Sequence, residues 1–130
     1  SLGAHSLATI GAHTHTHSAL SMLSEEEAYS EMAQSKKLLE KKLGYSVNSI
    51  AYPYGREKEA AQREFNLAKK CGFQTGVTTY PDPLIDPQLH AIPRLGVPFF
   101  VNKRVLRTKL SGCENFVRKL VTLGKNRKKL

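Results

Sequence analysis

The sequence has few cysteines, no long apolar run and no low-complexity tract. Cys71 and Cys113 lie far apart in 130 residues, which excludes a disulfide framework and is more typical of isolated thiols than of a bridge. No apolar run approaches the roughly 20 residues of a membrane-spanning helix, and the first eleven residues lack the pattern of a signal peptide. Long Gly, Ser or Gln tracts are absent and 40% of the residues are hydrophobic, so we expect a soluble globular domain.

Acidic residues are also scarce. The chain has 11 Asp and Glu against 20 Lys and Arg, and much of the net charge of +9 falls between Lys103 and Leu130, where Glu114 is the one acid. Such a run attracts phosphate, anionic lipid or acidic glycan, although a solvated face of terminal helices is its commoner meaning. Aromatic residues do not alternate with these basic residues to form a stacking platform for bases, so we expect no nucleic-acid partner.

The first third of the chain predicts a strand, a loop and a long helix. The apolar residues 8–12 suit a buried strand that runs into a loop. Ser24 with Glu27 three places later forms a capping box, and Gly44 after a basic helix end supplies a left-handed stop. Apolar and small residues between them recur at helical spacing: Ala28, Met32, Ser35, Leu39 and Leu43.

The middle of the chain continues this alternation. Residues 47–52 are rich in strand formers and stop at Pro53-Tyr54-Gly55. Residues 57–71 predict a helix that buries Ala61, Phe65 and Ala68, and residues 74–79 predict a third strand. Alternating strands and helices favour parallel strands joined by right-handed crossovers, in an open sheet or a barrel, with functional loops at the carboxyl ends of the strands.

The last third is less regular. Residues 80–89 contain three prolines and predict a loop, and residues 91–97 form a short apolar run interrupted by Pro93-Arg94. Residues 102–110 and 114–123 can each form a basic helix.

Three histidines, His13, His15 and His17, stand in five positions of a chain that has five histidines in all. Imidazole is the commonest neutral metal ligand, and two imidazoles on a compact loop can bind one zinc ion. In an extended segment all three rings would face one side, whereas in a turn His13 and His17 converge and His15 points away. The alternative is a purification-tag remnant or a solvated polar loop, but the alternation with Thr directly after a strand favours a functional cluster.

Two motifs resemble those of a known family. IGAHTHTHSAL resembles the His-Thr-x-x-His motif of NodB-type polysaccharide deacetylases (carbohydrate esterase family four), and IAYPYG resembles their next motif. AIPRLGV is similar to the Leu-Pro-Arg segment of the branch that uses YPYG. The resemblance covers about residues 5–110, and the ordered pair of motifs is more specific than either motif alone.

The resemblance implies an α/β fold, a partial version of the family's distorted (β/α) barrel that lacks the first strand or strands. It also implies a divalent metal, zinc or a similar ion, with His13 and His17 as ligands and Thr14 as a brace of their loop. A metal-activated water would then attack the acetamide of an N-acetylated glycan, with the backbone amide of Tyr54 as oxyanion donor. Pro53 and Arg94 would contact the substrate, and the family's usual place is the bacterial cell envelope or periplasm.

Three departures from the family pattern stand out. The Thr-Phe-Asp-Asp motif is absent, so neither the base nor the acidic ligand is assigned; we expect a fragment, rather than a degenerate gene product or a site completed by a second polypeptide. Ala51 stands where many members have Arg; Arg94 can replace that charge, and a surface or ion-paired role for Arg94 is the equal alternative. His90 is the one free candidate for the acid, although a lone His there is more often structural. Asp82 and Asp86 suit loop caps better than catalytic roles.

We therefore expect residues 1–100 to be a partial deacetylase catalytic domain and residues 101–130 a basic helical extension. The complete protein would remove N-acetyl groups from an amino-sugar polysaccharide or oligosaccharide with a bound metal, and this chain alone would be nearly inactive. A noncatalytic carbohydrate-binding or metal-binding remnant is the alternative, followed by a basic module for anionic polymers. Because a barrel without its first strands exposes edges, we also expect a homo-oligomer or a missing N-terminal segment.

Overall fold

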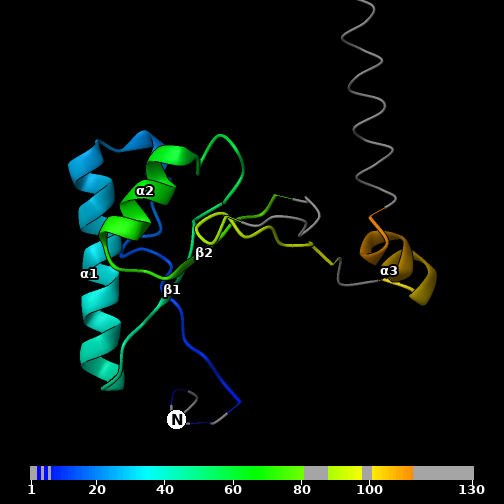
Figure 1. Cartoon of the computed structure of the whole chain (residues 1–130), viewed down its shortest axis with the longest axis horizontal. Helices are drawn as coiled ribbons and strands as arrows, with labels where there is room; N and C mark the ends of the chain where they lie inside the picture. Colours follow the sequence, from blue (N-terminus) through cyan, green and yellow to red (C-terminus); the bar gives the residue numbers. More distant parts are fainter. Residues whose placement is uncertain (1–2, 4, 6, 81–87, 98–100, 113–130) are drawn as a thin grey trace, which may run out of the picture.

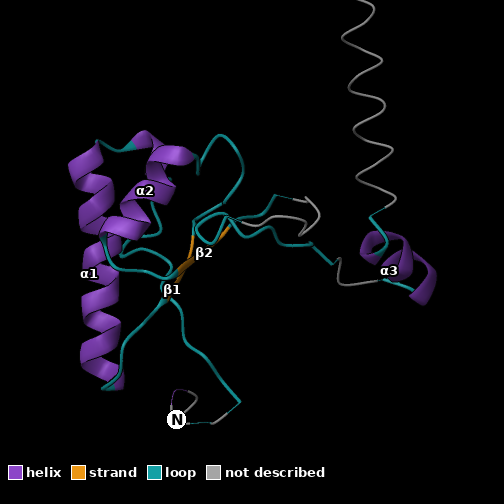
Figure 2. Ribbon diagram, in the orientation of Figure 1, coloured by secondary structure: helices purple, strands orange, loops and turns teal. Residues whose placement is uncertain are grey.

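A computed structural model describes residues 3, 5, 7–80, 88–97 and 101–112 of the chain (Figures 1 and 2). Cys113, Asp82, Asp86 and the helix expected over residues 114–123 lie outside the described residues. The elements in chain order are the 3-10 helix η2 (Leu20–Met22), α1 (Glu25–Leu43), β1 (Ser49–Ala51), α2 (Gln62–Lys70), β2 (Thr75–Val77) and α3 (Lys103–Leu110).

Helix α1 begins and ends where its sequence signals predict. The Ser24 hydroxyl accepts a hydrogen bond from the Glu27 amide at 3.2 Å, and the Glu27 carboxylate accepts one from the Ser24 amide at 2.9 Å. Gly44 ends the helix in the left-handed conformation, with φ of 76°. Ala28, Met32 and Ser35 form the buried stripe, so the expected inward face is confirmed.

The strands are parallel, as predicted, but shorter than the sequence suggested. Strand β1 pairs with β2 in the register Ser49 with Thr75 and Ala51 with Val77. Single parallel bridges add Ala12 on the outer side of β1 and residue 92 on the outer side of β2. The segment of residues 8–12 is therefore not a full strand among the described residues, because only Ala12 pairs with a neighbour.

The second helix starts later than predicted. Helix α2 begins at Gln62 rather than at residue 57, because residues 56–60 form turns on the carbonyl of Arg56 and Ala61 is extended, with φ of −135°. Ala61 is exposed instead of buried, and its amide donates to the Glu64 carboxylate at 2.9 Å. Phe65 and Ala68 are buried as predicted, and Leu67 is the third buried apolar residue of the helix in place of Ala61.

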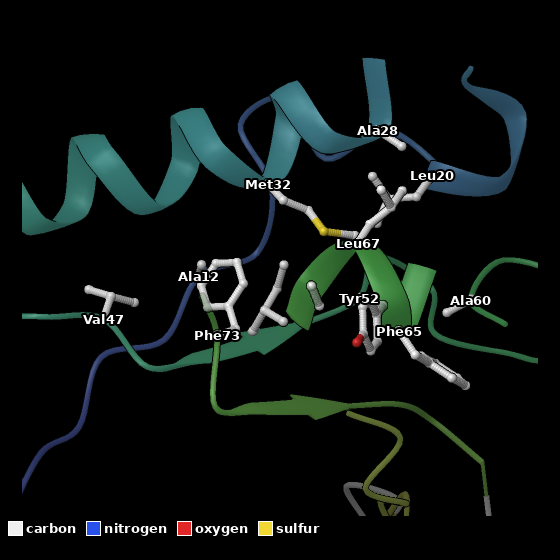
Figure 3. Close-up of a cluster of buried hydrophobic side chains, with 12 residues drawn as sticks. Ala12, Leu20, Ala28, Met32, Val47, Tyr52, Ala60, Phe65, Leu67 and Phe73 are labelled. Atoms are coloured by element: carbon white, nitrogen blue, oxygen red, sulfur yellow. The ribbon is translucent and has the colours of Figure 1, made fainter. Parts of the chain in front are cut away.

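The hydrophobic core lies between the two helices and one face of the small sheet (Figure 3). Met32 of α1, Leu67 of α2 and Ile50 of β1 are all buried in it. The ring of Tyr52 packs against that of Phe65 with centroids 5.5 Å apart. Burial of such apolar surface is the main stabilising contribution to the fold, at about 25 cal/mol per Å². The core thus holds β1 in place, because Ile50 of this strand and Tyr52 directly after it are both buried there.

Helix α3 stands away from this α/β body in Figure 1. Its start is set by Asn102, whose side-chain oxygen accepts the Val105 amide at 2.9 Å, so the expected helix over residues 102–110 is confirmed. Among the described residues, no helix combines the length and the apolar character needed to cross a bilayer.

Candidate metal and substrate site

The site residues follow the carboxyl ends of three adjacent parallel segments. His13 comes directly after Ala12, Tyr54 follows β1, and Thr79 follows β2. The Ala51 amide donates to the carbonyl of Ala12 at 2.9 Å. Parallel strands present these ends at one edge of the sheet, so loops distant in sequence meet there.

The rings of His13 and His17 lie together at this edge. Their centroids are 4.7 Å apart with an interplanar angle of 73°, and the His17 ring is 5.3 Å from that of Tyr54. His15 makes neither ring contact; instead its backbone amide binds Glu31 on α1. The chain thus bends so that the first and third histidines converge, which is the turn geometry considered from the sequence.

Left-handed backbone at non-glycine residues is concentrated at this site. Thr14 and His17 each have φ of 63° and Tyr54 has φ of 60°, and they are the non-glycine residues of positive φ among the described residues. A β-branched residue such as Thr is rare in this region, and strain of this kind is typical of functional sites. The His17 amide donates to the Thr14 hydroxyl at 3.1 Å, so Thr14 braces the loop as predicted.

The hydrogen bond of His13 fixes the state of its ring. Its Nδ1 lies 2.7 Å from the carbonyl oxygen of Ala51. A carbonyl can only accept, so Nδ1 carries the proton and the lone pair of a neutral ring is on Nε2. Metal-binding histidines usually donate their second ring N–H to a carbonyl or carboxylate in this way. Nε2 is therefore the ring nitrogen with which His13 could bind a cation.

Glu31 anchors the loop of residues 13–17, the histidine loop, to α1. One carboxylate oxygen accepts the amides of His15 at 3.0 Å and Thr16 at 2.8 Å, and the other accepts the Thr16 hydroxyl at 3.0 Å. Burial opposes ionisation of this carboxyl group, but the hydrogen bonds from Thr16 and His15 outweigh it and lower the pKa of Glu31. The loop between the two ligand candidates is therefore held by a carboxylate.

The Pro53-Tyr54-Gly55 turn is fixed by Thr79. The Thr79 hydroxyl donates to the carbonyl of Tyr54 at 2.7 Å, and the Thr79 amide donates to that of Gly55 at 2.8 Å. Pro53 is buried beneath the turn, whereas Tyr54 is 57% exposed. Within the described part of the chain, the Tyr54 amide makes no hydrogen bond and remains available to an incoming acceptor.

Arg94 reaches the same edge and His90 does not. Arg94 donates from Nε to the carbonyl of Thr78 at 2.7 Å, just beyond β2. The His90 Nε2 is 2.9 Å from the carbonyl of Phe73, which precedes β2, so the ring donates there at the opposite, amino end of the strand. The structure therefore brings His13, His17, Tyr54 and Arg94 to one edge and leaves His90 at the other.

Sequence reasoning missed Glu31 and Thr79. Thr79 carried a weak signal, because it ends the threonine-rich strand that precedes a proline-containing loop. Glu31 carried less, since α1 contains several other glutamates, although its place between Ala28 and Ser35 puts it beside the buried stripe.

The donor set fits a divalent cation in part. Two converging imidazoles supply two of the three protein ligands that a catalytic zinc ion usually has. Among the described ranges, no group of three or more His, Cys, Asp and Glu side chains is placed to hold a metal ion. The described residues thus bring together two candidate metal donors, His13 and His17, without a third beside them.

Residues 4–76 match the protein family described as polysaccharide deacetylase. That match covers more than half of the chain and includes both histidines and the tyrosine turn. The chain belongs to the polysaccharide deacetylase family. The resemblance seen in the two motifs is thus confirmed.

Three known proteins are similar to parts of this chain. The Bacillus subtilis (strain 168) protein named "Putative polysaccharide deacetylase YxkH" is 37% identical over 90 residues, which is 68% of this chain and 31% of that protein. IcaB from Ammonifex degensii matches in structure with a TM-score of 0.56 and 22% identity, covering 72% of this chain and 43% of its own. The Streptococcus pyogenes deacetylase PplD, solved with acetate, is 34% identical over 52% of this chain and 28% of its own, with a TM-score of 0.48. The chain spans about a third of the length of the curated relative.

Proposed function

We propose that the complete protein hydrolyses N-acetyl groups on an amino-sugar polysaccharide or oligosaccharide, with a divalent cation, zinc or a similar ion, held in part by His13 and His17. Membership of the polysaccharide deacetylase family supports the reaction class. The observation that carries the site is the convergence of the two rings 4.7 Å apart, beside Tyr54 and with the Nδ1 of His13 bound to a carbonyl.

Each residue then has a role that follows from its surroundings. A bound cation would lower the pKa of water and polarise the acetamide carbonyl. His13 and His17 would direct lone pairs toward that position, and Glu31 and Thr14 would keep their loop bent. The free amide of Tyr54, held in place because Thr79 binds the two carbonyls that follow it, those of Tyr54 and Gly55, would donate to the oxygen that gains negative charge.

Substrate recognition falls to residues around the turn. Arg94 lies at the same edge and is tied through Nε to Thr78, so its terminal guanidinium nitrogens are directed by a fixed stem. A guanidinium there would bind a hydroxyl or carbonyl oxygen of the sugar. Pro53 is buried and shapes the floor of the turn, and the exposed ring of Tyr54 offers an apolar face to a sugar ring.

The acid and base belong to other parts of the complete protein in this proposal. The His90 ring is engaged with the carbonyl of Phe73, which supports a structural role for it more than the acid role that its sequence position suggested. The parallel segments would form part of the family's (β/α) barrel, and the outer edge at Ala12 would be covered by another segment or a second copy. This chain alone would then show little activity.

Release of acetate from N-acetylglucosamine oligomers tests the proposal. With the complete protein, His13→Gln and His17→Gln should each lower kcat/KM at least about 100-fold, since loss of a metal ligand removes the activated water. His15→Gln, the matched control in the same loop, should retain activity. Equal activity of the His17→Gln protein, or full activity after chelation with a tight zinc chelator, would refute the metal role.

A further inference from the structure

The carboxylate of Glu31 reaches across from α1 to the middle of the histidine loop. It accepts three hydrogen bonds, from the amides of His15 and Thr16 and from the hydroxyl of Thr16, at 2.8 to 3.0 Å. These donors lie between the two converging rings in sequence. Glu31 itself is half-buried on a helix whose inner face is fixed by the core, so its position is set by packing rather than by the loop.

The loop needs such support because its own conformation is unfavourable. Thr14 and His17 both occupy left-handed backbone, at φ of 63°, a strained conformation that persists in non-glycine residues only where the surrounding structure enforces it. The single bond inside the loop, from the His17 amide to the Thr14 hydroxyl, ties its two ends together. The bonds to Glu31 are the contacts that tie its middle to the rest of the fold among the described residues.

We propose that Glu31 is the positioning residue of the metal-binding pair, acting through the backbone of residues 15 and 16 to hold His13 and His17 in convergence. The inference rests on the proposed function, which makes these rings ligands, but assigns a role to a residue that contacts neither ring. A carboxylate that preorganises a loop lowers the cost of ordering both ligands before the cation arrives. Without it, the two rings would bind the cation one at a time.

Cobalt(II) titration of the 130-residue chain, followed by NMR of the imidazole protons, distinguishes one-ring from two-ring binding. In the wild-type chain, the signals of His13 and His17 should shift together with one dissociation constant. Glu31→Gln should raise that constant about tenfold, as loss of supporting hydrogen bonds around metal ligands does, and should make the two rings titrate separately. A purely structural role would change stability without separating the titrations.

Three companion variants isolate the hydrogen bonds from the charge and the fold. Glu26→Gln removes the same charge from the same helix and should leave the titration unchanged. Glu31→Asp keeps both acceptor oxygens and should restore joint titration in part. Thr16→Val removes one of the three donors, and its effect should be less than additive with that of Glu31→Gln.

The outcomes separate this inference from the proposed function. If cobalt(II) shifts neither ring in the wild-type chain, the metal role of the pair fails. If both rings shift together in the wild-type and equally in Glu31→Gln, the metal role stands and the positioning role of Glu31 is refuted. Circular dichroism of every variant shows that the helices are intact; if Glu31→Gln is unfolded, joint titration in Thr16→Val at the wild-type constant refutes the positioning role.

Discussion

His13 donates its Nδ1–H to the carbonyl of Ala51, 38 residues later in the chain, at 2.7 Å. The same residue, Ala51, donates its amide to the carbonyl of Ala12, directly before His13. The strand pairing and the ring orientation are thus parts of one arrangement: the register that places Ala51 beside Ala12 also selects the tautomer of His13. A change that shifts this register would therefore reorient the candidate ligand.

The tautomer of His13 is a direct prediction. Nitrogen-15 NMR of the ring at a pH where it is neutral should show Nδ1 as the protonated nitrogen, although free histidine favours the other tautomer, because the Ala51 carbonyl can only accept. On addition of zinc, the Nε2 signal should change far more than that of Nδ1. An Nε2-protonated ring in the folded chain would contradict the geometry. His5, outside the site, provides the reference signal.

Gly76 of β2 should not tolerate a side chain. A Cβ at this position would lie 2.3 Å from the hydroxyl oxygen of Tyr52 and 2.8 Å from the carbonyl of His90, where that hydroxyl also binds. Gly76→Ala should lower the free energy of unfolding by about 1–3 kcal/mol, the usual cost of overpacking. Urea denaturation measures it. The control is Gly96→Ala, because a Cβ there meets nothing within 4 Å, and an equal loss in both variants would contradict the prediction.

Helix α1 was predictable from sequence because its determinants are local. Ser24 and Glu27 are three residues apart and Gly44 acts on the turn that precedes it, so each signal can be recognised without knowing the fold. The start of α2 was not predictable in this way. Ala60 is held in place by the hydroxyl of Tyr80, 20 residues later, which donates to its carbonyl, and no capping side chain at Ala61 marks the boundary.

The residues of the candidate site likewise differ in whether local sequence signals could predict their positions. The proximity of His13 and His17 and the position of Tyr54 followed from clustering, strand ends and the family motifs. The role of Glu31 could not be predicted, because it binds His15 and Thr16, which lie 16 and 15 residues earlier in the chain. The residues next to Glu31 in the sequence do not distinguish it from Glu26. The position of His90 at the amino end of β2 likewise depends on pairing through Gly76, which sequence alone does not reveal.

The stability of the fold should decrease in acid through three carboxylates of α1. The pKa of Glu27 is lowered by the Ser24 amide and hydroxyl, that of Glu40 by the Val47 amide and by Lys36, and that of Glu31 by its loop bonds despite burial. Because each folded-state pKa lies below the ordinary 4.5, their contribution is complete above that pH and is lost as the pH falls through the lowered values.

Urea midpoints measured between pH 7 and pH 3 check this dependence. The midpoint should be nearly constant above about pH 5 and fall below it, since protonation weakens the bonds that these carboxylates accept. Glu27→Gln should reduce the slope in acid, because one of the three groups no longer titrates. Glu25→Gln, on the same helix turn but outside the capping box, is the matched control; an identical slope in the wild-type chain and Glu27→Gln would contradict the assignment.

Cys71 should react slowly with thiol reagents in the folded chain. Burial raises its pKa from 9.0 to about 11, despite the opposing effect of Lys36 and Lys70, and its Sγ donates to the carbonyl of Tyr29 at 3.8 Å. In a Cys113→Ser background at pH 8, modification by an aromatic disulfide should be about 100-fold slower than for an unfolded thiol, because the thiolate is the reactive form. Adding urea should remove the difference. Equally fast labelling in the folded chain would mean that this thiol is open to solvent and that α1 and α2 do not pack as described.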